Sequence, residues 1–243
     1  MSTSTLHGER TNALLDDLWE QGIRRMSLLM RHSAREYAPG KHDLENPLTE
    51  EGRRLAHQFG SRLRPELALR AYASPVARCE DTAELIHAAH REIGGRGRGG
   101  SRPVEGLGVF YVLDQMKMFK AMSTSTEGMG SFVRAWLDGR IPEDIMLPAP
   151  QAARSLLKLL TTRLETQEAS PALDVCVSHD LTLYLMREVC LGLSRESHGD
   201  VLYLDGMVVF DRGGEWCVAT HDQPPKSVAR LLDGSPAVDA RIA

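Results

Sequence analysis

Arginine and histidine residues gather at three points of the sequence where a run of apolar residues ends. Histidine offers an imidazole nitrogen that can attack phosphorus or carry a proton, and arginine offers a forked cation that binds oxyanions. Three arginines and two histidines in one place would bind a dianion, and a phosphoryl group is the best match to several guanidinium donors. The residues concerned are Arg31, His32 and Arg35, then Arg78, and finally His179 with Asp180 beside it.

The elements expected around these residues would bring them together. Apolar runs at 26–31, 69–73 and 173–177 are typical of buried strands. Helices are expected over 49–63 with Thr49 as N-cap, from Pro75 with Ser74 as N-cap, and over 181–191, where Gly192 ends the helix. The carboxyl ends of parallel strands meet at one edge of a sheet, which is where open α/β proteins bind their ligands. A parallel sheet would therefore place the three points side by side.

Each segment also has an ordinary interpretation. A strand followed by a charged loop explains Arg31 to Arg35 about as well, and Arg78 alone is better explained as a surface arginine paired with Asp81 or Glu84. Only the three segments together favour a binding site. The two histidines could also ligate a metal, but the neighbouring arginines would repel a divalent cation, so the sequence implies no metal site and no cofactor.

Length and composition are those of a single globular domain. The chain has 243 residues and a formal net charge of −4 at pH 7, which gives no reason to expect a nucleic-acid or membrane partner. The four cysteines lack C-x-x-C spacing and no signal peptide is visible, so we expect reduced cysteines and a cytoplasmic location. Residues 115–149 are expected to form a small cap over the site, and Lys117 and Lys120 either line a pocket or lie on an amphipathic surface turn. The oligomeric state stays open.

These segments resemble those of the histidine phosphatase superfamily. The resemblance rests on Arg31-His32, on LTEEGRRLAHQFGSRLR at 48–64, on SPVARCEDTAELI at 74–86 and on SHDLTL at 178–183, which occur in the family's order and spread over most of the chain. It implies a phosphoglycerate mutase-like α/β fold, in which a mostly parallel central sheet lies between two layers of helices. It also implies catalysis through a phosphohistidine on His32, with Arg31, Arg78 and His179 as the rest of the phosphate pocket.

Two details resemble the acid phosphatase branch of this family. Arg35 matches an additional phosphate-binding arginine of that branch, and Asp180 matches its proton donor. The mutase branch takes its acid from a glutamate in the middle of the chain, where this sequence keeps Glu105 and Asp114 as candidate substitutes. One departure concerns the backbone beside the nucleophile, where Ser33 stands in place of the family's usual glycine.

The residues and the resemblance together predict a metal-independent phosphomonoesterase that acts on a small phosphorylated metabolite. The alternatives are a phosphoglycerate mutase-type phosphotransferase, a protein phosphohistidine phosphatase, and a non-catalytic protein that binds a phosphorylated ligand. If Asp180 is the proton donor, it must be protonated to assist the leaving alkoxide, so we expect an acidic to mildly acidic pH optimum.

Overall fold

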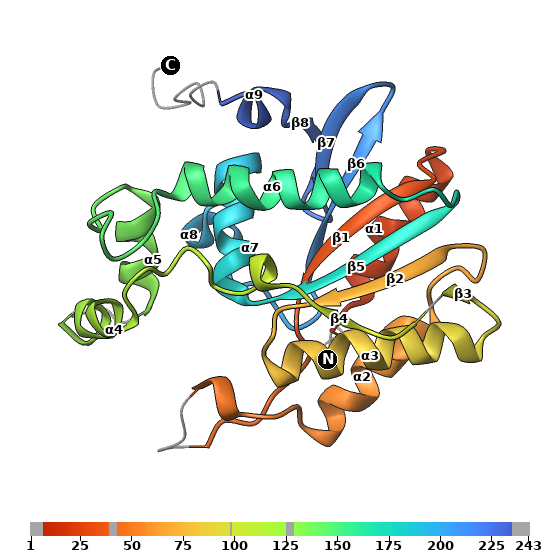
Figure 1. The fold of residues 1–243 in the computed structure, drawn as a ribbon, viewed down its shortest axis with the longest axis horizontal. Coiled ribbons are helices and arrows are strands. Elements are labelled where there is room, and N and C mark those ends of the chain that lie inside the picture. The colour runs from red at the N-terminus through yellow and green to blue at the C-terminus, as the bar shows by residue number, and fades with distance from the viewer. Residues whose placement is uncertain (1–6, 39–42, 98, 125–128, 235–243) are drawn as a thin grey trace.

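One mixed β-sheet organises the molecule (Figure 1). The computed structural model describes residues 7–38, 43–97, 99–124 and 129–234. The strands lie in the order β3-β2-β5-β1-β6-β7-β8, and β4 also pairs with β2. Their bounds are β1 Arg25–Arg31, β2 Ala68–Ala73, β3 Arg96–Gly97, β4 Arg102–Pro103, β5 Ala172–Ser178, β6 Gly206–Arg212, β7 Glu215–Thr220 and β8 Gln223–Ser227.

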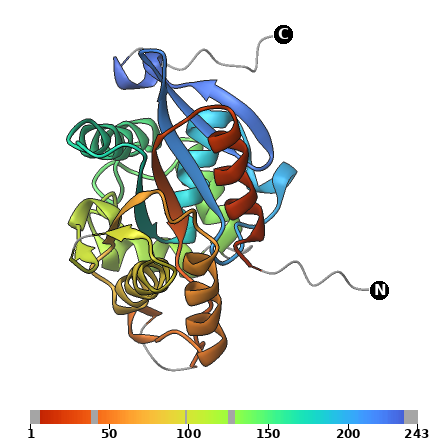
Figure 2. The same ribbon diagram turned by 90° about the vertical axis from the view of Figure 1, so that its right-hand side faces the viewer.

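Helices cover both faces of this sheet, which confirms the three-layer α/β/α architecture. They are α1 Glu9–Glu20, α2 Glu50–Ser61, α3 Ala77–Glu92, α4 Gln115–Thr124, α5 Met129–Leu137, α6 Ala149–Glu165, α7 Asp180–Met186, α8 Arg195–His198 and α9 Ala229–Leu232. Short 3-10 turns lie at Asp43–Glu45 and Glu105–Leu107, and α7 continues into a π-helical turn at Arg187–Leu191. Figure 2 shows α1, α2 and α3 on one side of the sheet and α6 on the other.

The alternation of side chains along β1 explains the two layers. Leu28 and Met30 point into the core that α1, α2 and α3 share with the sheet. Leu29, between them, points into the opposite core, which α6 and α7 cover. Successive residues of a strand face opposite sides, so a strand buried on both faces has to be apolar at every position. This is why the segment is a continuous apolar run rather than an alternating one.

The sheet is parallel where the predicted site lies. β2, β5 and β1 run parallel, with Arg31 opposite Ser178 and Ala73 opposite Val177. β6, β7 and β8 are antiparallel, so the prediction of a mostly parallel sheet holds for the part centred on β5 and not for the C-terminal strands. The register brings the ends of three strands to the same edge, so the residues that follow them meet there.

Some predicted boundaries were wrong. Thr49 caps α2 as expected, since its hydroxyl accepts from the Gly52 amide at 2.9 Å. Ser74 does not cap α3, which begins at Ala77, because the Ser74 hydroxyl is hydrogen-bonded to His179 instead. The proline-rich segment from Gln223 forms the edge strand β8.

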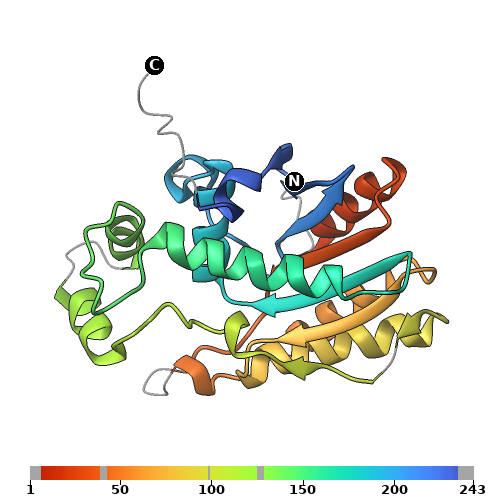
Figure 3. The same ribbon diagram turned by 45° about the horizontal axis from the view of Figure 1, so that its top comes forward.

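Figure 3 shows α6 lying along the sheet and α4 with α5 beyond its end, within the range predicted as a cap. Residues 125–128 of that range lie outside the described residues. All four cysteines are buried and free of disulfides. Among the described residues, no helix is both long and apolar enough to cross a membrane.

Candidate active site

His32 directly follows β1 and lies at the centre of the candidate site. Its backbone amide extends the pairing with β5 by donating to the Ser178 carbonyl at 3.0 Å. His32 is 2% exposed, with ring atom Nδ1 at 2.7 Å from the Ser33 carbonyl oxygen and Nε2 at 3.0 Å from Nε of Arg78. A carbonyl can only accept, so Nδ1 carries the proton and Nε2 keeps its lone pair. Burial, with Arg78 and His179 nearby, lowers the pKa of His32 to about 2, so the ring is neutral at ordinary pH.

His179 follows β5 and faces His32 across the strand ends. The ring centroids are 5.9 Å apart in an edge-on arrangement. Nε2 of His179 lies 2.9 Å from the hydroxyl of Ser74, the residue after β2. Burial and the nearby Arg78 lower the pKa of His179 to about 4. The parallel strands thus bring both predicted histidines to one point, as the sequence suggested.

Each predicted phosphate-binding arginine is paired with a carboxylate. Arg31 contacts Asp180 at 2.8 Å, and Arg35 contacts Asp43 at 2.6 Å. Arg78 is 3% exposed and donates to the same Asp43, from one terminal nitrogen to the carboxylate at 3.1 Å and from the other to the main-chain oxygen at 2.8 Å. All three arginines therefore already bind an anion, and that anion is a carboxylate of the chain itself.

Two residues at this site escaped the sequence analysis. Asp43 belongs to the long loop before α2, and nothing in that loop distinguishes it from an ordinary solvent-facing acid. Tyr203 lies between β6 and the end of α8, with its ring 5.9 Å from that of His32 and 4.3 Å beneath the Arg31 guanidinium. A lone tyrosine in an apolar run carries no sequence signal of this kind.

Two hydrogen bonds of Ser33 hold the backbone that follows His32. Its amide donates to the Thr82 hydroxyl at 3.1 Å, and its own hydroxyl donates to the Gly52 carbonyl at 2.7 Å. Among the non-glycine residues that the structure describes, only Leu204 has a positive φ, so the backbone at Ser33 is one that any residue can adopt. The serine side chain therefore adds one anchor that a glycine could not supply, the hydroxyl contact with Gly52, without backbone strain.

The three candidate acids occupy different surroundings. Asp180 is at the site, where its second carboxyl oxygen accepts from the Leu181 amide at 2.9 Å. Glu105 is the first residue of the 3-10 turn 105–107, whose Leu107 carbonyl accepts a hydrogen bond from the Ser178 hydroxyl. The side chain of Glu105 is exposed and has no hydrogen bond to any described residue. Asp114 accepts from the Lys117 amide at the start of α4, which is a helix-capping contact. Asp180 is thus the candidate that touches another residue of the predicted site.

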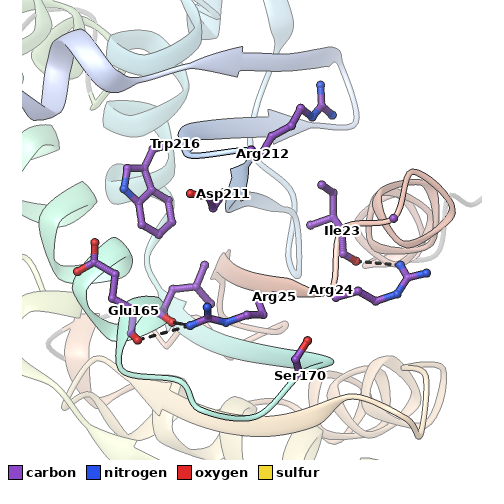
Figure 4. Close-up of a pocket in the computed structure, with 11 residues that line it drawn as sticks. Ile23, Arg24, Arg25, Glu165, Ser170, Asp211, Arg212 and Trp216 are labelled. Atoms are coloured by element: carbon purple, nitrogen blue, oxygen red, sulfur yellow. Dashed lines mark hydrogen bonds between the residues drawn. The ribbon is translucent and has the colours of Figure 1, made fainter.

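A cleft of about 460 Å³ lies at the N-terminal end of β1, the end opposite to His32 (Figure 4). Its basic residues already serve the fold: Arg25 donates to the Gln167 carbonyl at 2.8 Å, and Arg24 donates to the Trp19 carbonyl at 2.6 Å. None of the predicted site residues lines it. Within the described part of the chain, no cluster of three or more His, Cys, Asp or Glu side chains could hold a metal ion.

Comparison with known proteins gives one family model and a set of solved structures with a similar fold. Residues 27–94 match the model of the histidine phosphatase superfamily (branch 1), whereas no curated protein matches the chain. YhfR of Bacillus stearothermophilus has the same fold, with 18% identity and a TM-score of 0.55, over 80% of this chain and 95% of that one.

Two further solved structures share the fold. A phosphoglycerate mutase from Bacillus anthracis str. Sterne is 17% identical, with a TM-score of 0.53 over 81% of this chain and 92% of its own. A phosphoserine phosphatase mutant from Entamoeba histolytica, in complex with phosphoserine, is 15% identical, with a TM-score of 0.51 over 80% of this chain and 95% of its own. The fold is therefore phosphoglycerate mutase-like, as predicted.

The branch suggested by the sequence has to be corrected. Arg35 and Asp180 resemble features of the acid phosphatase branch, but the family model that residues 27–94 match is that of branch 1. Two single residues are too short a signal to separate the branches, because an arginine and an aspartate can equally serve as partners in ion pairs within the chain. In this protein Arg35 pairs with Asp43, and Asp180 pairs with Arg31.

Proposed function

We propose that the protein is a phosphomonoesterase that needs no metal ion and acts on a small phosphorylated metabolite through a phosphohistidine on His32. One observation carries the proposal: a neutral, buried imidazole keeps its Nε2 lone pair free of a proton and directs it at Arg78. A phosphoryl group bound by Arg78 would lie where that nitrogen can attack it. The flanking Arg31, Arg35 and His179 favour a phosphoryl group over other electrophiles.

The chemistry divides into two displacements. Nε2 of His32 attacks phosphorus as the ester oxygen leaves in line with it, and Asp180 protonates that oxygen. Guanidinium groups stabilise the equatorial oxygens, which is the role a bound cation fills in other phosphoryl-transfer sites. Asp180 then accepts a proton from water, the water oxygen bonds to phosphorus, and the bond to Nε2 breaks. Inorganic phosphate and a restored neutral His32 result.

The contacts of Arg78 have to rearrange before the first step. Arg78 covers the Nε2 lone pair, and Asp43 occupies the other nitrogens of Arg78. An incoming phosphate would replace the carboxylate as the anion and draw the Arg78 guanidinium towards itself. The same exchange would free Nε2 for attack, so substrate binding and nucleophile release are one event.

The test is hydrolysis of p-nitrophenyl phosphate with EDTA present, across pH 4 to 9. The wild type should turn over, and His32→Ala should lose at least about a thousandfold in rate, as removal of a nucleophile does elsewhere. His57→Asn is the matched control, because His57 lies on the exposed side of α2, paired with Glu92. Turnover that survives in His32→Ala, or that EDTA abolishes in the wild type, would refute the proposal.

A further inference from the structure

A cleft of about 350 Å³ adjoins the proposed phosphate site and shares two of its residues. Arg31 and Asp180 form one wall. The rest comes from α5, α7, α8 and the loop before β6, which lie next to one another in Figure 1. The volume is near the lower end of the range for ligand pockets, about 300–1,000 Å³. If a phosphate lies against Arg31, the group attached to it extends into this cleft.

One side of the cleft is apolar. Val133 of α5, Leu181 of α7 and Leu202 contribute it. Side chains of this kind cover the carbon skeleton of a ligand without directing its polar groups. Val133 belongs to the region 115–149 that is predicted as a cap. Helix α5 of that region therefore forms part of the wall of the cleft.

The polar side is organised around Asp200. Its Oδ1 accepts both from the Tyr184 hydroxyl at 2.9 Å and from Nε of Arg195 at 2.5 Å. The described residues offer Oδ2 no hydrogen bond, and the side chain is 59% exposed. The hydrogen bonds from Arg195 and Tyr184 lower the pKa of Asp200, so the group is an ionised acceptor. Its outer oxygen is suited to a hydroxyl donor on a ligand.

The charges of the cleft cancel in pairs. Arg31 is bound to Asp180, and Arg195 is bound to Asp200. A second anionic group on the substrate would find no unpaired cation among these residues, and it would meet the exposed carboxylate of Asp200. A neutral hydroxyl meets an acceptor at Asp200 and further N–H donors on Arg195.

Resting on the proposed function, we propose that this cleft holds the leaving group of the substrate and selects a neutral, polyhydroxylated one, such as a polyol or sugar, over one that carries a second anion. Asp200 is the residue that determines this specificity. Arg195 and Tyr184 hold its carboxylate in place.

The test compares two ligands that differ only in this respect, glycerol 3-phosphate and 3-phosphoglycerate. Binding is measured by calorimetry on His32→Ala, which cannot consume the ester. We expect glycerol 3-phosphate to bind at least about tenfold more tightly, because the carboxylate of the other ligand faces Asp200. Adding Asp200→Asn should reduce the ratio of the two affinities at least about fivefold. The substitution removes the negative charge of Asp200 and leaves the Arg195 cation free to bind the carboxylate of 3-phosphoglycerate.

Glu196→Gln is the matched control. Glu196 lies on the same helix as Arg195 but pairs with Arg134 at 3.6 Å, so its neutralisation should leave the ratio unchanged. Equal affinities, or tighter binding of 3-phosphoglycerate, would overturn the inference even if Asp200→Asn failed to fold. An unchanged ratio in a folded Asp200→Asn protein would also overturn it.

Turnover separates this inference from the proposed function. If the wild type hydrolyses neither ester, nor p-nitrophenyl phosphate, but the binding preference is present, the proposed function fails and the selective cleft stands. If the wild type hydrolyses 3-phosphoglycerate as efficiently as glycerol 3-phosphate, with equal affinities, the function stands and the inference fails.

Discussion

Nε of Arg78 lies 3.0 Å from Nε2 of His32, so a guanidinium N–H covers the lone pair that would attack phosphorus. The remaining nitrogens of Arg78 are held by Asp43. His32 itself is 2% exposed. Access to Nε2 of His32 therefore depends on which anion binds Arg78.

Asp43 is such a competitor, and its removal should strengthen phosphate binding. A ligand that binds only when Asp43 has moved away loses affinity in proportion to the rarity of that state, and a state open one-tenth of the time costs about tenfold. We expect Asp43→Asn and Asp43→Ala to bind inorganic phosphate about tenfold more tightly in calorimetry.

Glu45→Gln is the control for Asp43, because Glu45 lies on the same turn and forms no ion pair with a described residue. It should bind phosphate as the wild type does. Weaker binding in Asp43→Asn would mean instead that the carboxylate holds the arginines in the geometry that phosphate needs.

Acid should destabilise the fold through the buried histidines. The pKa of His179 is lowered to about 4 and that of His32 to about 2, so below pH 6.5 the unfolded chain binds more protons than the folded protein. Each histidine then costs up to about 1.4 kcal/mol per pH unit until its folded pKa is reached. Urea unfolding at pH 7 and pH 5 should show a smaller loss for His179→Asn than for the wild type. His57→Asn, which changes an exposed histidine, should lose as much as the wild type; equal losses in all three would contradict the assignment.

Gly52→Ala should damage catalysis through the backbone. A Cβ at this position would lie 1.9 Å from the carbonyl oxygen of Ala34, so the segment after His32 has to move. We expect a loss of roughly 1–3 kcal/mol in stability, as for other overpacked sites, together with a fall in kcat of the folded protein.

Gly60→Ala separates the two effects of Gly52→Ala. Gly60 lies on α2, as Gly52 does, but away from His32. A Cβ at position 60 would lie 2.3 Å from the carbonyl oxygen of Ile86 on α3. Gly60→Ala should destabilise the fold to a similar extent and leave kcat of the folded protein near that of the wild type. A wild-type kcat in folded Gly52→Ala would show that the 33–34 backbone does not set the position of His32.

The proton donor can be identified by the leaving group. An alkyl phosphate needs acid catalysis far more than p-nitrophenyl phosphate does, and a positioned acid contributes about 10²–10⁴-fold. Asp180→Asn should therefore reduce hydrolysis of glycerol 3-phosphate by at least about 100-fold and that of the aryl ester much less. If the selective loss occurs in Glu105→Gln or Asp114→Asn instead, the acid is that residue.

The positions of the site were predictable where they depend on strand order, and not where they depend on loops. Apolar runs that end in Arg31-His32 and Ser178-His179 fix both histidines at the sheet edge once the strands are parallel. Asp43 was out of reach, because its contact with Arg78 spans 35 positions and depends on the path of a loop without a pattern. Ser74 was misjudged because a capping serine and a serine that binds a histidine look alike until the other strand is in place.

The hydrogen bond from Nδ1 of His32 ends on a main-chain carbonyl, that of Ser33. A side-chain acceptor at this place could be lost by a single base change, whereas the peptide oxygen is present whichever amino acid occupies position 33. Which ring nitrogen of His32 carries the proton therefore does not depend on the side chain at position 33. A change of side chain at position 33 can alter the packing against α2 while Nε2 of His32 keeps its lone pair.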